Sequence, residues 1–196
     1  MAWSAVSAFV GLVLILAGTP KLLAPRAFSR VVRGFRVLPD PLARPVARVV
    51  PVAEVLAGAA LVTGVATPVA AAAATALFAA FTAGLVVNLA RGRRDIDCGC
   101  FGFTEPPAGE LARIGPWHAL RAAGLGAASA ALVLAAPTTP AVAERFQGAC
   151  LAAVVVLLAL VVARVARVVD RGPTRADTHL ADASVRYRAA LARTAR

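Results

Sequence analysis

The stretch that decides the fold is residues 68–90, PVAAAAATALFAAFTAGLVVNLA, which contains no charged residue. A helix of about 20 apolar residues is long enough to cross the hydrocarbon core of a bilayer, which is about 30 Å thick. No polar stripe recurs along this stretch at a period of 3.6 residues, so the helix is expected to be apolar on all sides. The pattern predicts a transmembrane helix.

Four further segments qualify as membrane spans or come close to it: Trp3 to about Leu23, about Val50–Ala66, about Trp117–Ala136 and about Phe146–Ala163. The last is expected to continue as a helix to Val169. The link between the second and third spans, from Gly64 to Pro68, is so short that it predicts an antiparallel hairpin. The first span lacks a basic leader and is too long for a typical signal peptide, so we expect it to be retained.

Composition agrees with this interpretation. The chain has 196 residues, of which 60% are hydrophobic and 16% charged, whereas globular proteins have about 45–50% apolar and about 25% charged residues. Disorder, a disulfide-stapled scaffold and an outer-membrane barrel do not fit long apolar runs and three cysteines. We expect an all-α polytopic protein in the lipid bilayer: a four-helix core in 1–136, an extra transmembrane helix in 137–169 and a basic cytoplasmic tail in 170–196.

The net charge of +11 comes mainly from arginine. These arginines stand between apolar runs and not along an aromatic groove, so nucleic-acid binding is not expected. With five spans, all but two of the 21 basic residues fall on one side of the membrane. The positive-inside rule then predicts a multi-pass protein of the inner (plasma) membrane with its N-terminus outside and its C-terminus in the cytoplasm.

One loop differs from the others because it contains Cys98, Gly99 and Cys100 directly after the third span. A disulfide between the two cysteines needs the turn that Gly99 permits, and the small ring is expected to be strained and easily reduced. That property suits electron exchange. Two alternatives stay open: buried thiols that only pack, and a metal site completed by His118 and an aspartate. Cys150 lies toward the other side and is expected to be a lone core cysteine.

Polar residues within or at the ends of apolar spans are costly and suggest a site. Five of them fall at the same end of the predicted bundle as the cysteine loop: Lys21, Glu54, Asn88, His118 and Arg121. Lys21 and Glu54 are at matching depth, which predicts an ion pair within a shared polar pocket. The alternative is that Lys21 reaches the interface and Glu54 caps the start of its own helix.

The sequence resembles the MauE family of methylamine-utilisation membrane proteins, which is related to the DoxX-like group. The resemblance covers about residues 3–136 and rests on these motifs: Gly18-x-x-Lys21-Leu22, Val37-Leu38-Pro39, Pro51-x-x-Glu54-x-x-x-Gly58 and Cys98-Gly99-Cys100-Phe101-Gly102. It implies a four-helix core associated with thiol–disulfide redox, in which Cys98 and Cys100 form the redox pair and Lys21 and Glu54 line the site. It also implies a role in maturing the disulfide-rich small subunit of methylamine dehydrogenase.

These observations favour a membrane thiol–disulfide oxidoreductase or electron conduit. Its expected partners are a thioredoxin-like protein or a disulfide-containing client, and a membrane quinone is the candidate cofactor. The alternative is a non-enzymatic membrane subunit that binds a partner or a metal and has structural cysteines. A small-solute transporter fits less well, because no inverted repeat and no mid-membrane charge pair is visible in the sequence.

Overall fold

The computed structural model describes residues 2–96, 114–134 and 142–169, and the side chains of the last helix up to Val162. Within these ranges the chain forms six α-helices: α1 (Ala2–Leu23), α2 (Pro25–Phe35), α3 (Asp40–Thr63), α4 (Thr67–Ala90), α5 (Pro116–Leu134) and α6 (Val142–Val169). All except α2 are long and apolar enough to cross a membrane. The predicted all-α polytopic fold is therefore confirmed.

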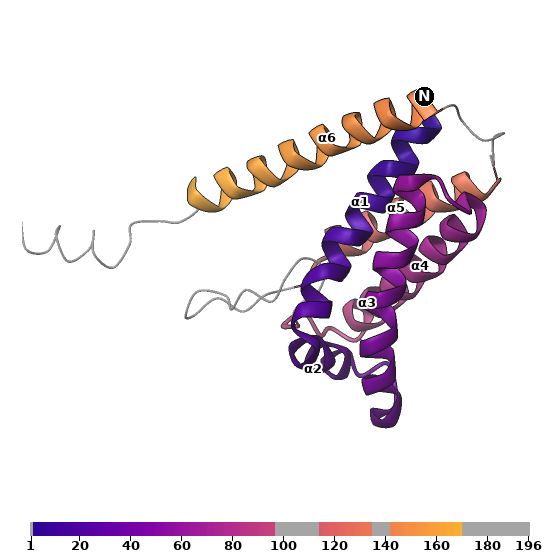
Figure 1. The fold of residues 1–196 in the computed structure, drawn as a ribbon. Helices are drawn as coiled ribbons and strands as arrows, with labels where there is room; N and C mark the ends of the chain where they lie inside the picture. The colour runs from indigo at the N-terminus through magenta and orange to yellow at the C-terminus, as the bar shows by residue number, and fades with distance from the viewer. Residues whose placement is uncertain (1, 97–113, 135–141, 170–196) are drawn as a thin grey trace, which may run out of the picture. The chain divides into compact units, whose positions relative to one another are not determined.

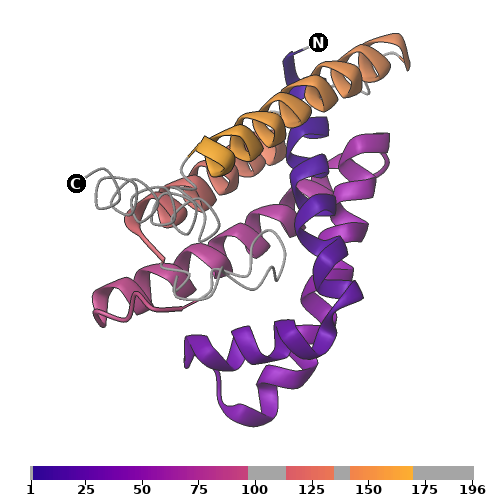
Figure 2. The ribbon, with the colours of Figure 1, turned by 90° about the vertical axis from the view of Figure 1, so that its left-hand side faces the viewer.

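The bundle consists of two helix pairs. Helix α1 packs mainly on α3, and α4 packs mainly on α5 (Figures 1 and 2). A tight turn joins the pairs, because Gly64 ends α3 in the left-handed conformation at φ 72° and α4 begins at Thr67. The predicted hairpin between the second and third spans is present. The core shared by the two helix pairs includes Val10, Leu14, Leu61 and Phe78.

Helix α1 shows how an apolar sequence selects a buried face. Ser7, Gly11, Leu14, Gly18 and Lys21 recur every three or four residues, and all five are buried. This spacing places them in one row along the helix. The row lies against α3. The Ser7 hydroxyl donates to the Leu61 carbonyl at 2.9 Å, and Gly18 faces Glu54, so the two helices run antiparallel.

One predicted helix boundary was wrong. The second span was expected to start near Val50, but α3 begins at Asp40, and Pro51 lies inside it. The first span was expected to end at about Leu23, and α1 does end there, with Pro20 inside its last turn. Apolar sequence marks where a helix enters the membrane, whereas the helix itself extends into the polar region, and a proline removes only one backbone donor.

Helix α2 was not predicted. It occupies what looked like a charged loop, at the end of the bundle where α1 ends and α3 begins (Figure 1). Pro25 stands in its first turn, Phe28 is buried, and Arg36 ends it in the left-handed conformation at φ 48° with its N–H donating to the Arg33 carbonyl. This short helix closes one end of the bundle.

Residues up to Val156 form one compact unit, and a second unit begins at Leu157 within α6. Helix α6 continues to Val169, as the sequence predicted. The Cys98, Gly99, Cys100 and Phe101 motif and the basic tail from 170 onward lie outside the described residues. The predicted domain boundaries at 136 and 169 stay predictions.

Candidate functional site

The most unusual feature inside the bundle is a buried ion pair. Lys21, in the last turn of α1, donates from its Nζ to Oε1 of Glu54 in α3 at 2.5 Å. The two side chains are 2% and 0% exposed. The ion pair expected from their matching depth in the sequence is therefore present. Because each charge would be costly to bury alone, each makes the other tolerable in an apolar bundle.

Two aromatic rings enclose the Lys21 ammonium group. Its Nζ lies 4.7 Å from the ring centroid of Phe81 in α4 and 5.1 Å from that of Phe28 in α2. Both distances fall within the range at which the negative face of a ring attracts a cation. Residues from α1, α2, α3 and α4 thus converge on one ammonium group, so this point ties four helices together.

The Glu54 carboxylate uses only one of its two oxygens in this pair. Oε2 is buried and accepts no hydrogen bond from any group in the described part of the chain. A buried acceptor without a donor costs about 1–3 kcal/mol. Any hydrogen-bond donor to Oε2 must therefore come from outside residues 2–96, 114–134 and 142–162.

A second polar cluster lies at the end of α4. Asn88 is fully buried, and its amide donates to the Gly84 carbonyl at 2.9 Å. The Arg93 guanidinium donates to Oδ1 of Asn88 at 3.0 Å and to the carbonyls of Gly34 and Phe35 at 2.9 and 3.3 Å. Arg93 therefore fastens the end of α2 to the end of α4.

One face of α4 connects the two clusters. Phe81, Leu85 and Asn88 follow one another at helical spacing, and at 1.5 Å per residue Phe81 and Asn88 are about 10 Å apart along the axis. Leu85 packs in a cluster with Ile96 and Ile114. The Ile114 N–H also donates to the Arg94 carbonyl at 2.9 Å. The chain thus leaves α4 and returns to α5 at the same place, and the stretch between Ile96 and Ile114 contains the two cysteines.

Comparison with known proteins now bears on these residues. The family model described as methylamine utilisation protein MauE matches residues 1–136. The chain belongs to the MauE family.

Relatives within the family share moderate identity with this chain. Over 100 residues it is 45% identical to the methylamine utilization protein MauE of Paracoccus denitrificans, covering 50% of this chain and 54% of that protein. The MauE protein of Methylophilus methylotrophus is 40% identical over 123 residues, 63% of each chain. That of Paracoccus versutus is 36% identical over 125 residues, 64% of this chain and 67% of that protein. The chain thus spans about half to two thirds of the length of these curated relatives. No solved structure gives a significant match.

The MauE-matched region contains all the predicted site residues, and the structure describes the contacts of four of them. Lys21 lies with Glu54, and Asn88 lies with Arg93. His118 accepts a hydrogen bond at Nδ1 from the Gly115 N–H at 3.1 Å, at the start of its own helix. Arg121 is half-buried on α5. The roles of Cys98, Gly99, Cys100 and Phe101 fall outside the described residues and stay predictions.

Sequence reasoning did not predict the contacts of three residues that build this end of the MauE-family bundle: Phe28, Phe81 and Arg93. Phe81 could not be singled out, because α4 is apolar on all sides and its sequence does not show which face turns inward. Arg93 belongs to the run Arg91-Gly92-Arg93-Arg94, and the sequence does not show which of these three arginines is partly buried. Among the described residues, no group of three His, Cys, Asp or Glu side chains is placed to hold a metal ion.

Proposed function

We propose that this MauE-family membrane protein takes part in thiol–disulfide redox, with Cys98 and Cys100 as the exchanging pair. The names of its relatives refer to methylamine utilization, and we extend that process to this chain as part of the proposal. The observation that carries the redox role is the buried Lys21–Glu54 pair, whose ammonium group lies over Phe81 of α4. Ile96 and Ile114, which flank the cysteine segment in the sequence, pack with Leu85, one turn further along α4.

Chain length supports this placement. Two residues of extended chain span at most about 7 Å, and Cys98 is the second residue after Ile96. Ile96 packs with Leu85, one helical turn from the ring of Phe81 that covers the Lys21 ammonium group. Cationic groups near a cysteine favour its reactive thiolate form. We propose that the cysteine pair faces this ammonium group and the unpaired acceptor of Glu54.

The proposed exchange proceeds through a mixed disulfide. One cysteine thiolate attacks a partner's disulfide and expels one partner thiolate. The second cysteine thiolate then attacks the mixed disulfide, expels the other partner thiolate and closes the Cys98–Cys100 bond. Two electrons pass to the partner, whose two thiolates take up two protons; the reverse sequence oxidises a partner dithiol. We propose a thioredoxin-like protein or a disulfide-containing client as this partner, and a membrane quinone or quinol as the two-electron reagent that resets the pair.

Trapping the redox state of the pair tests the proposal. In a C150S background, Cys98 and Cys100 are the only cysteines of the chain. Cells are treated with diamide or dithiothreitol, quenched in acid, and alkylated with a maleimide of known mass. We expect two labels after reduction and none after oxidation. We also expect C98S or C100S to accumulate a complex with a partner that dithiothreitol releases, whereas C150S alone does not.

A different result identifies the alternative function. If both thiols take up label equally under oxidising and reducing conditions, and neither serine variant traps a partner, the cysteines do not exchange. The protein would then be a non-enzymatic membrane subunit with structural cysteines. Insertion of every variant into the membrane is checked by its resistance to carbonate extraction.

A further inference from the structure

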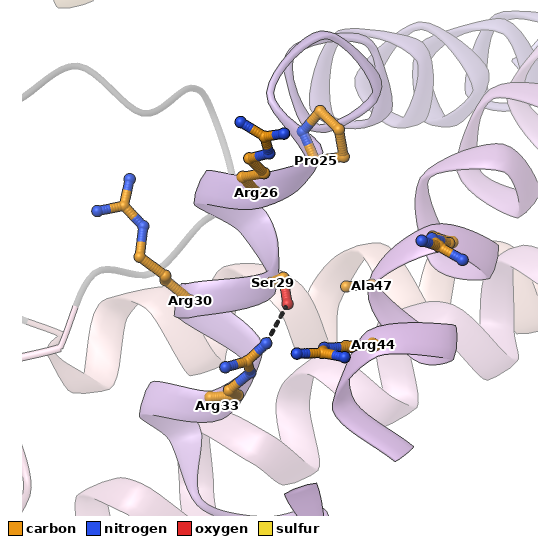
Figure 3. Close-up of a pocket in the computed structure, with 8 residues that line it drawn as sticks. Pro25, Arg26, Ser29, Arg30, Arg33, Arg44 and Ala47 are labelled. Atoms are coloured by element: carbon orange, nitrogen blue, oxygen red, sulfur yellow. Dashed lines mark hydrogen bonds between the residues drawn. The ribbon is translucent and has the colours of Figure 1, made fainter. Parts of the chain in front are cut away.

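A further polar site, separate from the Lys21–Glu54 pair and from the Asn88–Arg93 cluster, lies between α2 and the first turns of α3. It is a cavity of about 670 Å³ (Figure 3). Five of the residues that line it are arginines, and a sixth is a serine: Arg26, Ser29, Arg30, Arg33, Arg44 and Arg48. The predicted site contains a single arginine, Arg121, so this cavity is a different kind of site.

The two helices present these arginines in rows. Arg26, Arg30 and Arg33 are spaced along one side of α2, and Arg44 and Arg48 are four residues apart on α3. Figure 3 shows Arg33 and Arg44 extending toward each other across the space between the helices, while Arg26 and Arg30 extend outward from α2. The Arg33 guanidinium also lies 3.4 Å from the Ser29 hydroxyl.

The positive charge of the cavity is not neutralised by carboxylates of the described residues. In the part of the chain that the structure describes, no carboxylate forms an ion pair with any of these five arginines. Facing guanidinium groups repel each other, and an anion placed between them removes that repulsion. Guanidinium groups match the oxygens of phosphate with paired hydrogen bonds, so phosphate is the anion for which this side-chain set is best suited.

The position of the cavity relative to the apolar spans indicates what kind of molecule carries the phosphate. Arg26 is the third residue after the last residue of α1, and Arg48 directly precedes the apolar part of α3. The arginines therefore stand where the apolar spans end, which is the level of lipid headgroups. Exposed apolar side chains lie close by in sequence: Leu22 and Leu23 at the end of α1, and Val49 and Val52 in α3. These apolar side chains offer a surface for acyl chains next to the cationic cavity.

We propose that this arginine cavity binds the phosphate of an anionic phospholipid, whose acyl chains lie along the exposed apolar residues of α1 and α3. A lipid with two phosphates binds more tightly than one with a single phosphate, because it neutralises more of the five guanidinium charges. A phosphocholine lipid binds most weakly, because its headgroup adds a positive charge. The site is independent of the proposed thiol exchange, which uses none of these arginines.

Native mass spectrometry of the full chain, released from detergent, tests this proposal. The protein is titrated separately with diphosphatidylglycerol, phosphatidylglycerol and phosphatidylcholine. The R33Q/R44Q variant is compared with R36Q/R94Q, which removes the same charge from exposed arginines that do not line the cavity. We expect the affinity for diphosphatidylglycerol to fall at least tenfold in R33Q/R44Q and less than twofold in R36Q/R94Q. The R33K/R44K variant keeps the charge but loses the paired N–H donors of guanidinium, so its affinity for diphosphatidylglycerol should lie between those of the two glutamine variants.

Two outcomes would overturn the proposal. An equal loss in both glutamine variants would mean that net charge alone attracts the lipid. Displacement of the lipid by soluble pyrophosphate at equal concentration would identify a free anion and not a lipid as the ligand. Circular dichroism verifies that each variant keeps its helix content. If R33Q/R44Q fails to fold, R44Q/R48Q on α3 replaces it with the same expected loss.

Discussion

Gly11 of α1 and Gly58 of α3 lie back to back: a Cβ atom added to either would come within 2.6 Å of the carbonyl oxygen of the other. Real Cβ atoms do not approach an oxygen so closely, so only glycine fits on both sides. Further along the same interface, a Cβ on Gly18 would lie 3.0 Å from the Glu54 Cβ. Small residues let helix backbones approach closely in a membrane. This approach brings Lys21 within reach of Glu54.

Replacing Gly58 with alanine should push α1 and α3 apart. The added methyl group meets backbone on the opposite helix, which cannot move aside as a side chain could. Overpacking of this kind costs about 1–3 kcal/mol, so we expect G58A to lower the free energy of unfolding by that amount in a detergent titration followed by circular dichroism. G124A is the matched control, because Gly124 lies in α5 with no atom within 4 Å of its added Cβ. Equal stability of G58A and wild type would contradict the close contact.

The Lys21–Glu54 pair predicts a second effect on stability. Removing one partner leaves the other charge buried without compensation, which costs about 3–5 kcal/mol. We therefore expect K21M and E54Q each to unfold at markedly lower denaturant concentration than wild type. The double variant K21M/E54Q should lose less than the sum of the two single losses, because it leaves no uncompensated charge. Additive losses in this double-mutant cycle would mean that the two residues do not interact.

The transmembrane helices and the ion pair could be predicted because both depend on quantities that the sequence displays directly. Apolar length reveals a span, and the depth of Lys21 and Glu54 follows from counting residues from the ends of their spans. The end of the bundle was harder to foresee. Phe28, Val31, Val32 and Phe35 recur at helical spacing after Pro25, which is the signal that could have revealed α2.

The aromatic enclosure of Lys21 could not be predicted for a physical reason. In a soluble helix the polar face shows which side is buried, but α4 is apolar on all sides, so its rotation about its own axis is set only by packing. Phe78 and Phe81 looked equivalent in the sequence. The structure shows that Phe78 packs in the bundle core, whereas Phe81 lies against the ammonium group.

The distribution of arginines predicts the orientation of the chain in the membrane. If the side that carries most of them is cytoplasmic, a fluorescent protein that matures only in the cytoplasm should fluoresce when fused after Arg196. Alkaline phosphatase, which is active only outside the cytoplasm, should be active when inserted at Val65, in the turn between α3 and α4. The same two reporters exchanged between these positions serve as controls. Phosphatase activity at Arg196 would contradict the predicted orientation.

Arg93 should control the stability of α2. It donates to the Gly34 and Phe35 carbonyls at the end of that helix and to Asn88 on α4, and hydrogen bonds from a charged donor contribute about 1.5–3 kcal/mol each. We expect R93Q to speed amide hydrogen exchange in Val31–Phe35 by about tenfold or more, because α2 then opens without unfolding of the bundle. R93K should show the same fast exchange as R93Q, because a single ammonium group cannot reach the several acceptors that the planar guanidinium group of Arg93 reaches. R94Q, which alters an exposed neighbour, should leave exchange in α2 unchanged. Equal exchange in R93Q and R94Q would show that other contacts, such as the packing of Phe35 against the cluster of Leu85 and Ile114, are sufficient to hold this helix in place.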